Sequence, residues 1–221
     1  KGWAKATAWN RAQLLYYIAE NLSARADEFA QRLADMTGKP GRTEVEASVE
    51  RLFTCAAWAD KWESRVKPVP IRGVALAMQE PVGVIGILAP DEAPLLGLIS
   101  LIAPAIALGN TVIAVPSAPF PLAATDLYQV LDTSDLPDGV INIVTGDPLD
   151  LAIPLAGHRD IDAVWCFSSQ PLSAVVEKAA SGNLKRTWVN HGRATDWAGF
   201  DAKAALAQAS EIKTVWVPYG E

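Results

Sequence analysis

The stretch that decides the fold is Gln79–Ser117, QEPVGVIGILAPDEAPLLGLISLIAPAIALGNTVIAVPS. Val84–Leu88 and Thr111–Val115 are short apolar runs of the kind that form buried strands. Between them, Pro90–Pro94 has the composition of a turn, and Leu95–Leu108 is apolar over a length that suits a helix. Two strands joined through a helix form a βαβ unit with parallel strands. The stretch therefore predicts a parallel sheet covered by helices.

The same alternation continues on both sides of this unit. Helices are predicted at residues 7–22, 23–37, 41–64, 120–131, 149–156 and 170–181, and strands at residues 140–143, 163–167, 185–189 and 212–217. Ser23 is predicted to cap the second helix. Residues 66–71 and 74–79 are predicted to form a hairpin joined at Arg72 and Gly73. The predicted fold class is α/β, a Rossmann-like doubly wound parallel sheet flanked by N-terminal helices.

Composition restricts the partners and the compartment. With 221 residues, half of them hydrophobic, the chain can bury one substantial core. A net charge of −6 and the lack of a basic cluster argue against a nucleic acid or an anionic membrane as partner. The longest apolar stretch, residues 93–107, is too short for a membrane span. Cys55 and Cys166 provide no disulfide framework, so a cytoplasmic location is expected. Because the chain begins at Lys1 and not at Met, we expect it to be a piece of something longer.

Four further blocks share one resemblance. Glu80–Gly83 (EPVG) leads into the first strand of the central unit, and Leu136–Asp147 reads LPDGVINIVTGD. Val164–Ser169 ends a strand before a helix, and Asn10–Pro40 has the pattern of paired helices. Together with Gln79–Ser117, these blocks resemble the NAD-binding domain of the aldehyde dehydrogenase superfamily. The resemblance implies a domain that binds NAD(P) in an enzyme whose cysteine thiolate attacks the aldehyde.

The loop after the first strand departs from the family pattern. The family has Pro-Trp-Asn-Phe-Pro, whose Asn helps to bind the oxyanion that forms when the thiolate attacks. Here the loop is Pro90-Asp91-Glu92-Ala93-Pro94. An ionised carboxylate has no N–H to donate and repels negative charge. Glu92 therefore opposes the electrostatic stabilisation that usually makes the largest contribution to catalysis.

The positions that resemble cofactor contacts are altered too. The family's Lys-Pro-Ser-Glu, whose lysine and glutamate bind the adenosine ribose, is Val115-Pro116-Ser117-Ala118 here. Ser168 replaces the glycine that lets the family's backbone approach the pyrophosphate at a helix N-terminus. NAD(P) binding is accordingly expected to be weak. The resemblance thus predicts a vestigial cofactor site made of Glu92, Val115, Ser117, Ser168 and Ser169.

The resemblance identifies no catalytic residue. Asn183–Arg186 matches the lead-in to the family's Leu-Glu-Leu-Gly-Gly-Lys, but Val189 or Asn190 stands where the general-base glutamate would be. A catalytic domain with the nucleophilic cysteine follows in the family, whereas only Arg193–Glu211 precede the final strand here. The segments RTWVNHG and IKTVWVPYGE are most similar to the C-terminal, cysteine-less unit of aldehyde dehydrogenase family 16. We therefore expect residues 1–221 to form a single domain without the catalytic domain.

The resemblance also implies an assembly surface. In the superfamily, the hairpin and the C-terminal strand form an oligomerisation flap, which adds to a sheet in a neighbouring subunit; residues 66–79 and 212–217 correspond to it. Exposed strand edges carry unpaired N–H and C=O groups. The expected partner is a second copy, in a homodimer, or an active aldehyde dehydrogenase domain. Trp188, Trp197 and Trp216 either anchor such an interface or pack in the core.

Several side chains allow more than one interpretation. Asp91 and Glu92 are a candidate pair of ligand-binding carboxylates, because they lie where α/β proteins bind ligands. In the alternative interpretation, the loop is solvated and Asp91 is a turn or helix-cap residue. Cys166 either lies near a helix N-terminus, which lowers the pKa of a thiol, or packs in the core. His191 is a lone acid–base candidate with no nucleophile to activate. No metal site is predicted, since nothing in the spacing brings His158 and His191 to these carboxylates.

Three functions follow from these features. The first is a non-catalytic structural module that binds another chain. The second is a vestigial or regulatory module that binds NAD(P) or another nucleotide. The third is a fragment of an active oxidoreductase whose chemistry is completed from elsewhere, which Glu92 disfavours.

Overall fold

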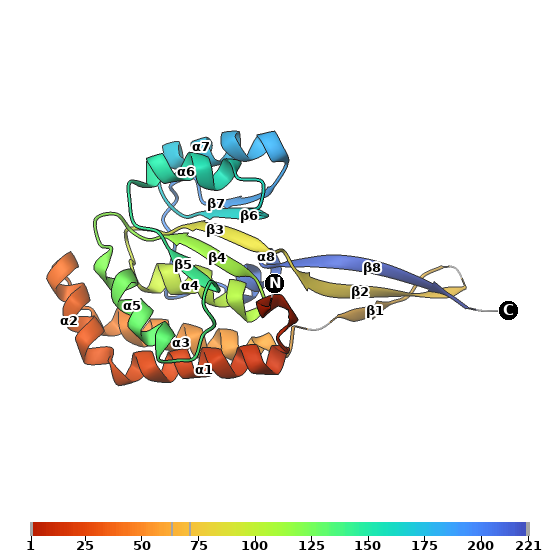
Figure 1. Cartoon of the computed structure of the whole chain (residues 1–221), viewed down its shortest axis with the longest axis horizontal. Coiled ribbons are helices and arrows are strands. Elements are labelled where there is room, and N and C mark those ends of the chain that lie inside the picture. Colours follow the sequence, from red (N-terminus) through yellow and green to blue (C-terminus); the bar gives the residue numbers. More distant parts are fainter. Residues whose placement is uncertain (1, 63, 71, 220–221) are drawn as a thin grey trace.

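The computed structural model describes residues 2–62, 64–70 and 72–219, and these residues contain two sheets (Figure 1). A parallel sheet has the order β5-β4-β3-β6-β7, and an antiparallel sheet has the order β1-β2-β8. The helices are α1 (Ala8–Ala24), α2 (Ala26–Thr37), α3 (Arg42–Ala59), α4 (Leu96–Ala107), α5 (Leu122–Asp132), α6 (Pro148–Gly157), α7 (Gln170–Ala180) and α8 (Ala202–Gln208). The strands are β1 (Arg65–Lys67), β2 (Gly73–Pro81), β3 (Val84–Leu88), β4 (Thr111–Val115), β5 (Ile141–Ile143), β6 (Ala163–Cys166), β7 (Arg186–Val189) and β8 (Ser210–Pro218). Helices α6 and α7 cover one face of the parallel sheet, and α4, backed by α1 and α3, covers the other.

The central βαβ unit forms where the sequence predicts it. Strands β3 and β4 pair in parallel, with Ile85 opposite Val112. All of α4 is buried, because it lies between the sheet and the layer of α1 and α3. Gly86 leaves room for α6, since a Cβ there would lie 2.7 Å from the Cγ of Leu155. Even α4 falls short of a membrane span, as does every other helix in the described part of the chain.

A helix buried along its whole length needs partners for its terminal backbone groups. At the N-terminus of α4, Oε1 of Glu44 accepts the N–H groups of residues 95 and 96 at 2.9 and 3.1 Å. At the C-terminus, Nε1 of Trp3 and Nε of Arg11 donate to the carbonyl groups of residues 106 and 107 at 3.0 and 2.8 Å. An anion at the first end and a cation at the second also suit the helix dipole. The N-terminal helices therefore fix the helix that supports the carboxyl edge of the sheet.

The prediction that Ser23 caps a helix is wrong. Helix α1 continues through Ser23 to Ala24, and α2 begins directly after Arg25 without a side-chain cap. The reason is packing, because Leu22 is fully buried against the core and holds this turn in the helix. Helix α3 ends at Ala59, earlier than predicted, and Glu63 lies outside the described residues.

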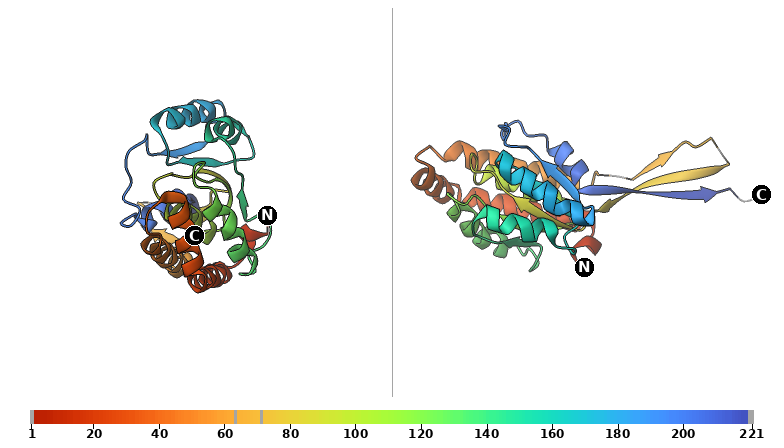
Figure 2. Two further views of the ribbon diagram at one scale, coloured as in Figure 1. Left: turned by 90° about the vertical axis from the view of Figure 1, so that its left-hand side faces the viewer. Right: turned by 90° about the horizontal axis from the view of Figure 1, so that it is seen from above.

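The antiparallel sheet projects from the body of the protein (Figures 1 and 2). Strand β2 pairs with β1 at residues 65–67 and with β8 along its whole length. This sheet unites the hairpin segment with the C-terminal strand, and we call it the flap. Its role in oligomerisation stays a prediction.

The predicted two-residue turn at Arg72 and Gly73 is wrong. Strand β1 ends at residue 67, and Gly73 is already part of β2. Pro68 and Pro70 have no N–H to donate, so the ladder stops before them. Ile71, the predicted end of the first strand, lies outside the described residues.

Helix α8 is absent from the sequence prediction. Asp201 caps it by accepting the N–H groups of Lys203 and Ala204 at 2.9 and 3.3 Å. Leu206, which is fully buried, belongs to the same core as α4. The short helix leads the chain from the parallel sheet directly into β8.

Candidate functional site

The candidate residues lie at the carboxyl ends of β3, β4 and β6. Val115 ends β4 and is buried in the core, so its side chain does not face a ligand. Ser117 is buried as well, and its hydroxyl donates to Oδ1 of Asp91 at 2.7 Å. This bond joins the loops after β3 and β4. Asp91 is a turn residue; the helix-cap alternative is wrong, because Glu44 accepts the N–H groups at the start of α4.

The carboxylate of Glu92 has a different hydrogen-bond partner from that of Asp91. The indole Nε1 of Trp197 donates to Oε1 of Glu92 at 3.0 Å. Asp91 and Glu92 therefore do not act as a pair, although both are exposed. The described residues contain no group of three or more His, Cys, Asp or Glu side chains that could hold a metal ion.

The N-terminus of α7 is the place where the resemblance puts a pyrophosphate. Ser169 caps this helix, with its hydroxyl accepting the N–H of Leu172 at 3.4 Å. Gly192 has a φ of +71°, and a Cβ on it would lie 2.8 Å from the backbone N of Gln170. The chain after β7 thus lies directly against the first residue of the helix. Ser168, at the family's glycine position, is half-buried beside this contact.

A cavity of about 380 Å³ remains next to α7. Ser168 and Ser169 line it together with Asp91, Glu92 and Arg193. A helix N-terminus and the guanidinium of Arg193 attract anions, but the two carboxylates on the facing loop, Asp91 and Glu92, outnumber this one cation and repel anions. The electrostatics of this half of the site therefore disfavour a pyrophosphate.

A second cavity, of about 470 Å³, lies between the ends of β4 and β5. Ser117, Ala118, Thr145 and Asp147 line it, with prolines and a glycine around them. Asp147 caps α6, accepting the N–H of Leu149 at 2.8 Å. No cation is among the residues that line this cavity, and Ala118 has no polar side-chain atom to reach a ribose. The space could hold a nucleoside, but its walls offer few polar partners.

Both thiols of the chain are buried and free. Loss of solvation raises the pKa of Cys55 to about 12 and that of Cys166 to about 11. The alternative in which a helix dipole lowers the pKa of Cys166 is therefore wrong. Its sulfur lies 4.0 Å from the hydroxyl of Ser173, within the core. A neutral, buried thiol is not a nucleophile.

The predicted base positions are structural as well. Val189 ends β7, and Asn190 forms the turn after it, donating to the carbonyl of Arg193 at 3.0 Å. His191 is half-exposed, and its Nε2 lies 3.7 Å from Oε1 of Glu177. His158 accepts the N–H of its neighbour Asp160 at 3.2 Å instead of approaching the loop carboxylates.

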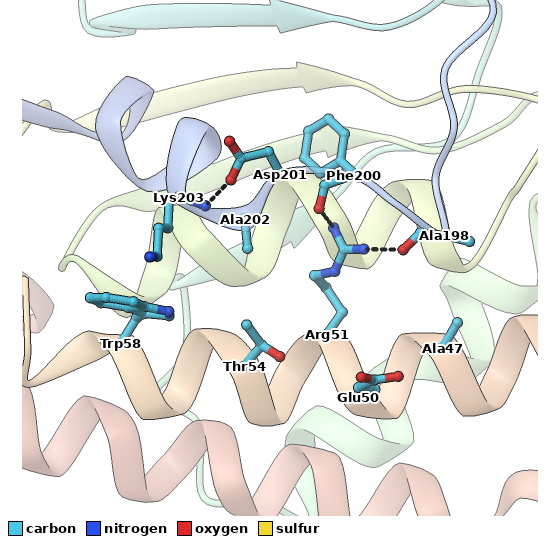
Figure 3. Close-up of a pocket in the computed structure, with 10 residues that line it drawn as sticks. All are labelled: Ala47, Glu50, Arg51, Thr54, Trp58, Ala198, Phe200, Asp201, Ala202 and Lys203. Carbon is cyan, nitrogen blue, oxygen red and sulfur yellow. Dashed lines mark hydrogen bonds between the residues drawn. The ribbon is translucent and has the colours of Figure 1, made fainter.

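Residues 193–201 form a strap that carries the chain from β7 to α8, and Arg51 of α3 holds it (Figure 3). Arg51 is 7% exposed, and its guanidinium donates to the backbone carbonyls of Trp197, Ala198 and Phe200 at 3.0, 3.2 and 2.9 Å. It also lies 5.5 Å from the centroid of the Phe200 ring. Burial lowers the pKa of this guanidinium. A cavity of about 430 Å³ opens beside this contact, between α3 and the strap.

The three candidate tryptophans have different roles. Trp197 is 4% exposed and packs at tilted angles against Phe200 at 5.0 Å and Phe167 at 5.4 Å between ring centroids. Trp188 packs edge-on against Phe167 at 4.8 Å. Trp197 belongs to the core, and Trp188 is partly buried and packs against it. Trp216, on the flap, is 54% exposed.

Comparisons with known proteins agree with this architecture. The aldehyde dehydrogenase family profile matches residues 1–212. The chain belongs to the aldehyde dehydrogenase family. It is 30% identical to the NADP/NAD-dependent aldehyde dehydrogenase PuuC of Escherichia coli over 99% of this chain and 45% of that protein. It is 31% identical to human retinaldehyde dehydrogenase 3 over 86% of this chain and 38% of that protein.

Solved structures confirm the predicted fold class for this family member. An aldehyde dehydrogenase from Burkholderia cenocepacia superposes with a TM-score of 0.82 at 29% identity, over 85% of this chain and 39% of that one. PnpE from a Pseudomonas species, crystallised with nicotinamide adenine dinucleotide, gives a TM-score of 0.82 at 28% identity, again over 85% of this chain and 39% of that one. This aldehyde dehydrogenase chain thus spans less than half the length of the relatives it matches.

Within this aldehyde dehydrogenase fold, two side chains that organise the site escape prediction from sequence. Glu44 and Arg51, both on α3, fix the start of α4 and the strap through contacts with residues far along the chain. The sequence offers one indication of their shared role, which is a spacing of seven residues that places them on one helix face. This spacing does not single them out, because any amphipathic helix has it. Charged residues on a helix facing the core are recognisable only when their partners are known.

Proposed function

We propose that this chain is a non-catalytic aldehyde dehydrogenase-like module with a structural role, comparable to the C-terminal unit of aldehyde dehydrogenase family 16. The observation that carries the proposal is the state of the thiols, since the chain's two cysteines are buried and have raised pKa values. Covalent attack on an aldehyde requires an accessible thiolate. Glu92 adds a second obstacle, because it presents a carboxylate where an oxyanion needs a donor.

The proposed work of the module is binding through the flap. Strand β8 is at the edge of its sheet and has nine residues, and its outer N–H and C=O groups are not paired within the sheet. An edge of this length is a template for another strand. The partner is a second copy or an active aldehyde dehydrogenase domain, within a larger assembly. The setting is the cytosol, where free cysteines such as Cys55 and Cys166 stay reduced.

One observation favours an alternative, the binding of a nucleotide without redox chemistry. The cavity of about 470 Å³ beside Ser117 and Thr145 is large enough for part of a dinucleotide. PnpE, which shares this fold, was crystallised with nicotinamide adenine dinucleotide. Against this, Val115 is buried and Ala118 is apolar, so neither supplies the ribose contacts.

Two measurements test the proposal. The purified chain should show no NAD- or NADP-dependent oxidation of a panel of aliphatic and aromatic aldehydes above the rate of a heat-inactivated control. Turnover that depends on chain concentration would refute the non-catalytic assignment. Isothermal titration with NAD and NADP separates the alternatives, because binding in the micromolar range would establish the nucleotide-binding role.

A further inference from the structure

The cavity of about 430 Å³ between α3 and the strap is lined by side chains of both elements (Figure 3). Arg51, Thr54 and Trp58 line it from α3, at the spacing of one helix face. Phe200, near the end of the strap, and Lys203, in α8, line it from the other side. We call it the strap cavity. It is separate from the vestigial cofactor site, because no residue of that site lines it.

The guanidinium of Arg51 is buried and has unused hydrogen-bond donors. Its three bonds to carbonyl groups of the strap use at most three of its five N–H groups. At least two N–H groups therefore have no acceptor in the described part of the chain. Arg51 is 7% exposed, and no ion pair among the described residues includes it. A buried cation without an anion is costly, so a negatively charged ligand would find a partner here.

A second cation, Lys203, lines the cavity without an anionic partner. Its Nζ lies 4.6 Å from the centroid of the Trp58 ring. Within residues 2–62, 64–70 and 72–219, no carboxylate forms an ion pair with it. Figure 3 shows Thr54 between Arg51 and Trp58 along α3, with no hydrogen bond to the other residues drawn. The wall of the cavity thus offers two cations and a hydroxyl group to a ligand.

Two carboxylates also line the cavity, but neither forms an ion pair with these cations. Oδ1 of Asp201 accepts the N–H groups of Lys203 and Ala204 as the cap of α8. Glu50 is exposed, so water screens its charge. In Figure 3 its carboxylate lies beside α3, whereas Arg51 extends from α3 to the strap. The buried guanidinium therefore acts on a ligand in the cavity more strongly than the carboxylates do.

We propose that the strap cavity binds a small aromatic carboxylate. The unused N–H groups of Arg51 and the ammonium group of Lys203 donate charge-assisted hydrogen bonds to the carboxylate. The rings of Trp58 and Phe200 provide aromatic walls for its ring. The volume of the cavity is in the range of sites for small molecules. The proposal goes beyond the structural function proposed above and does not depend on it.

Isothermal titration of the full chain with 2-naphthoate tests the proposal, and 2-naphthamide is the uncharged control. The carboxylate should bind saturably with a Kd below about 1 mM, and the amide at least ~10-fold more weakly, because it lacks the charge. Amide chemical shifts of residues 47–58 and 198–203 should change during the titration. The proposal is overturned by three results: no saturable binding of 2-naphthoate at millimolar concentration, equal binding of the two compounds, or shift changes confined to residues 116–121 and 145–148.

Lys203→Met and Lys178→Met form a matched pair of variants. Both lysines are exposed helical residues, but Lys178 lies on α7, which covers the opposite face of the parallel sheet from α3. Lys203→Met should raise the Kd for 2-naphthoate about 10-fold, and Lys203→Arg should change it less than about threefold, because it keeps the charge. Lys178→Met should leave the Kd unchanged. Circular dichroism confirms that all three variants fold. Equal weakening by the two methionine substitutions would indicate attraction by net charge alone and would overturn the site.

Discussion

Replacing Arg51 by methionine tests whether this side chain holds the strap. The guanidinium donates three hydrogen bonds to backbone carbonyls of the strap, at 2.9 to 3.2 Å. At about 1 kcal/mol net for each bond, their loss amounts to about 3 kcal/mol. Methionine keeps much of the apolar stem and removes a buried charge, which offsets part of this loss. We therefore expect Arg51→Met to lower the free energy of unfolding by 2–3 kcal/mol, or the melting temperature by about 4–12 °C.

Urea denaturation followed by tryptophan fluorescence measures the change, and hydrogen exchange locates it. Amides of residues 193–201 should lose protection before those of the parallel sheet. Arg42 on the same helix is the control, because it is exposed and pairs with Asp27 and Glu46 at the surface. Arg42→Met should cost less than about 1 kcal/mol. Equal effects of the two substitutions, or unchanged protection of the strap, would show that Arg51 does not anchor it.

Three further predictions concern the site and the flap. Burial raises the pKa of Glu44 above its usual value of 4.5, so the folded state binds its proton more tightly than the unfolded state does. The contribution of protonated Glu44 to the free energy of unfolding is therefore fully present below about pH 4.5. This contribution is lost as the pH rises through the raised pKa. Glutamine does not titrate, so the Glu44→Gln variant does not lose stability in this way. The difference in urea midpoint between variant and wild type should grow with pH and then level off. A difference that stays constant with pH would contradict the raised pKa of Glu44. Cys55 and Cys166 should not react with a maleimide reagent at pH 7 until urea unfolds the chain, whereas rapid labelling of the native protein would contradict their burial. Deleting residues 212–221 should reduce the number of chains in the assembly, as measured by light scattering, while the far-ultraviolet circular dichroism still shows a folded body. An unchanged oligomeric state in that folded variant would refute the flap as an interface.

The sequence predicts the parallel sheet well because its signals are local. Strands β3 and β4 have the predicted bounds, since each is a short apolar run closed by Gly, Asn or Pro. The failures occur where tertiary contacts outweigh local preference. Ser23 has a side chain that often caps helices, but the burial of Leu22 keeps Ser23 inside α1. Helix α8 has seven residues, too few for a periodic pattern to predict.

The site was harder to predict because its hydrogen bonds join residues far apart in the chain. The same problem is clearest outside the site, at Asn110, which precedes β4 at the amino-terminal edge of the parallel sheet. It is fully buried, and its side chain donates to the carbonyls of Ala105 and Ala209 at 2.9 and 2.8 Å and accepts the N–H of Gly83 at 2.8 Å. One amide thus connects the start of β3, the end of α4 and the entry to β8. Nothing within a short window of sequence distinguishes it from an asparagine in an exposed turn.

Position 92 shows how structure and catalysis compete for one side chain. To stabilise an oxyanion, a side chain there has to donate an N–H to the negatively charged oxygen, whereas here it accepts one from Trp197. That indole is fixed by its tilted packing against Phe167 and Phe200, and Arg51 donates a hydrogen bond to the backbone carbonyl of the same residue. The acceptor at position 92 is therefore required by the strap, and turning it to face a substrate would leave the indole N–H without this partner. The hydrogen bond to Trp197 thus ties the orientation of the Glu92 carboxylate to the position of the strap.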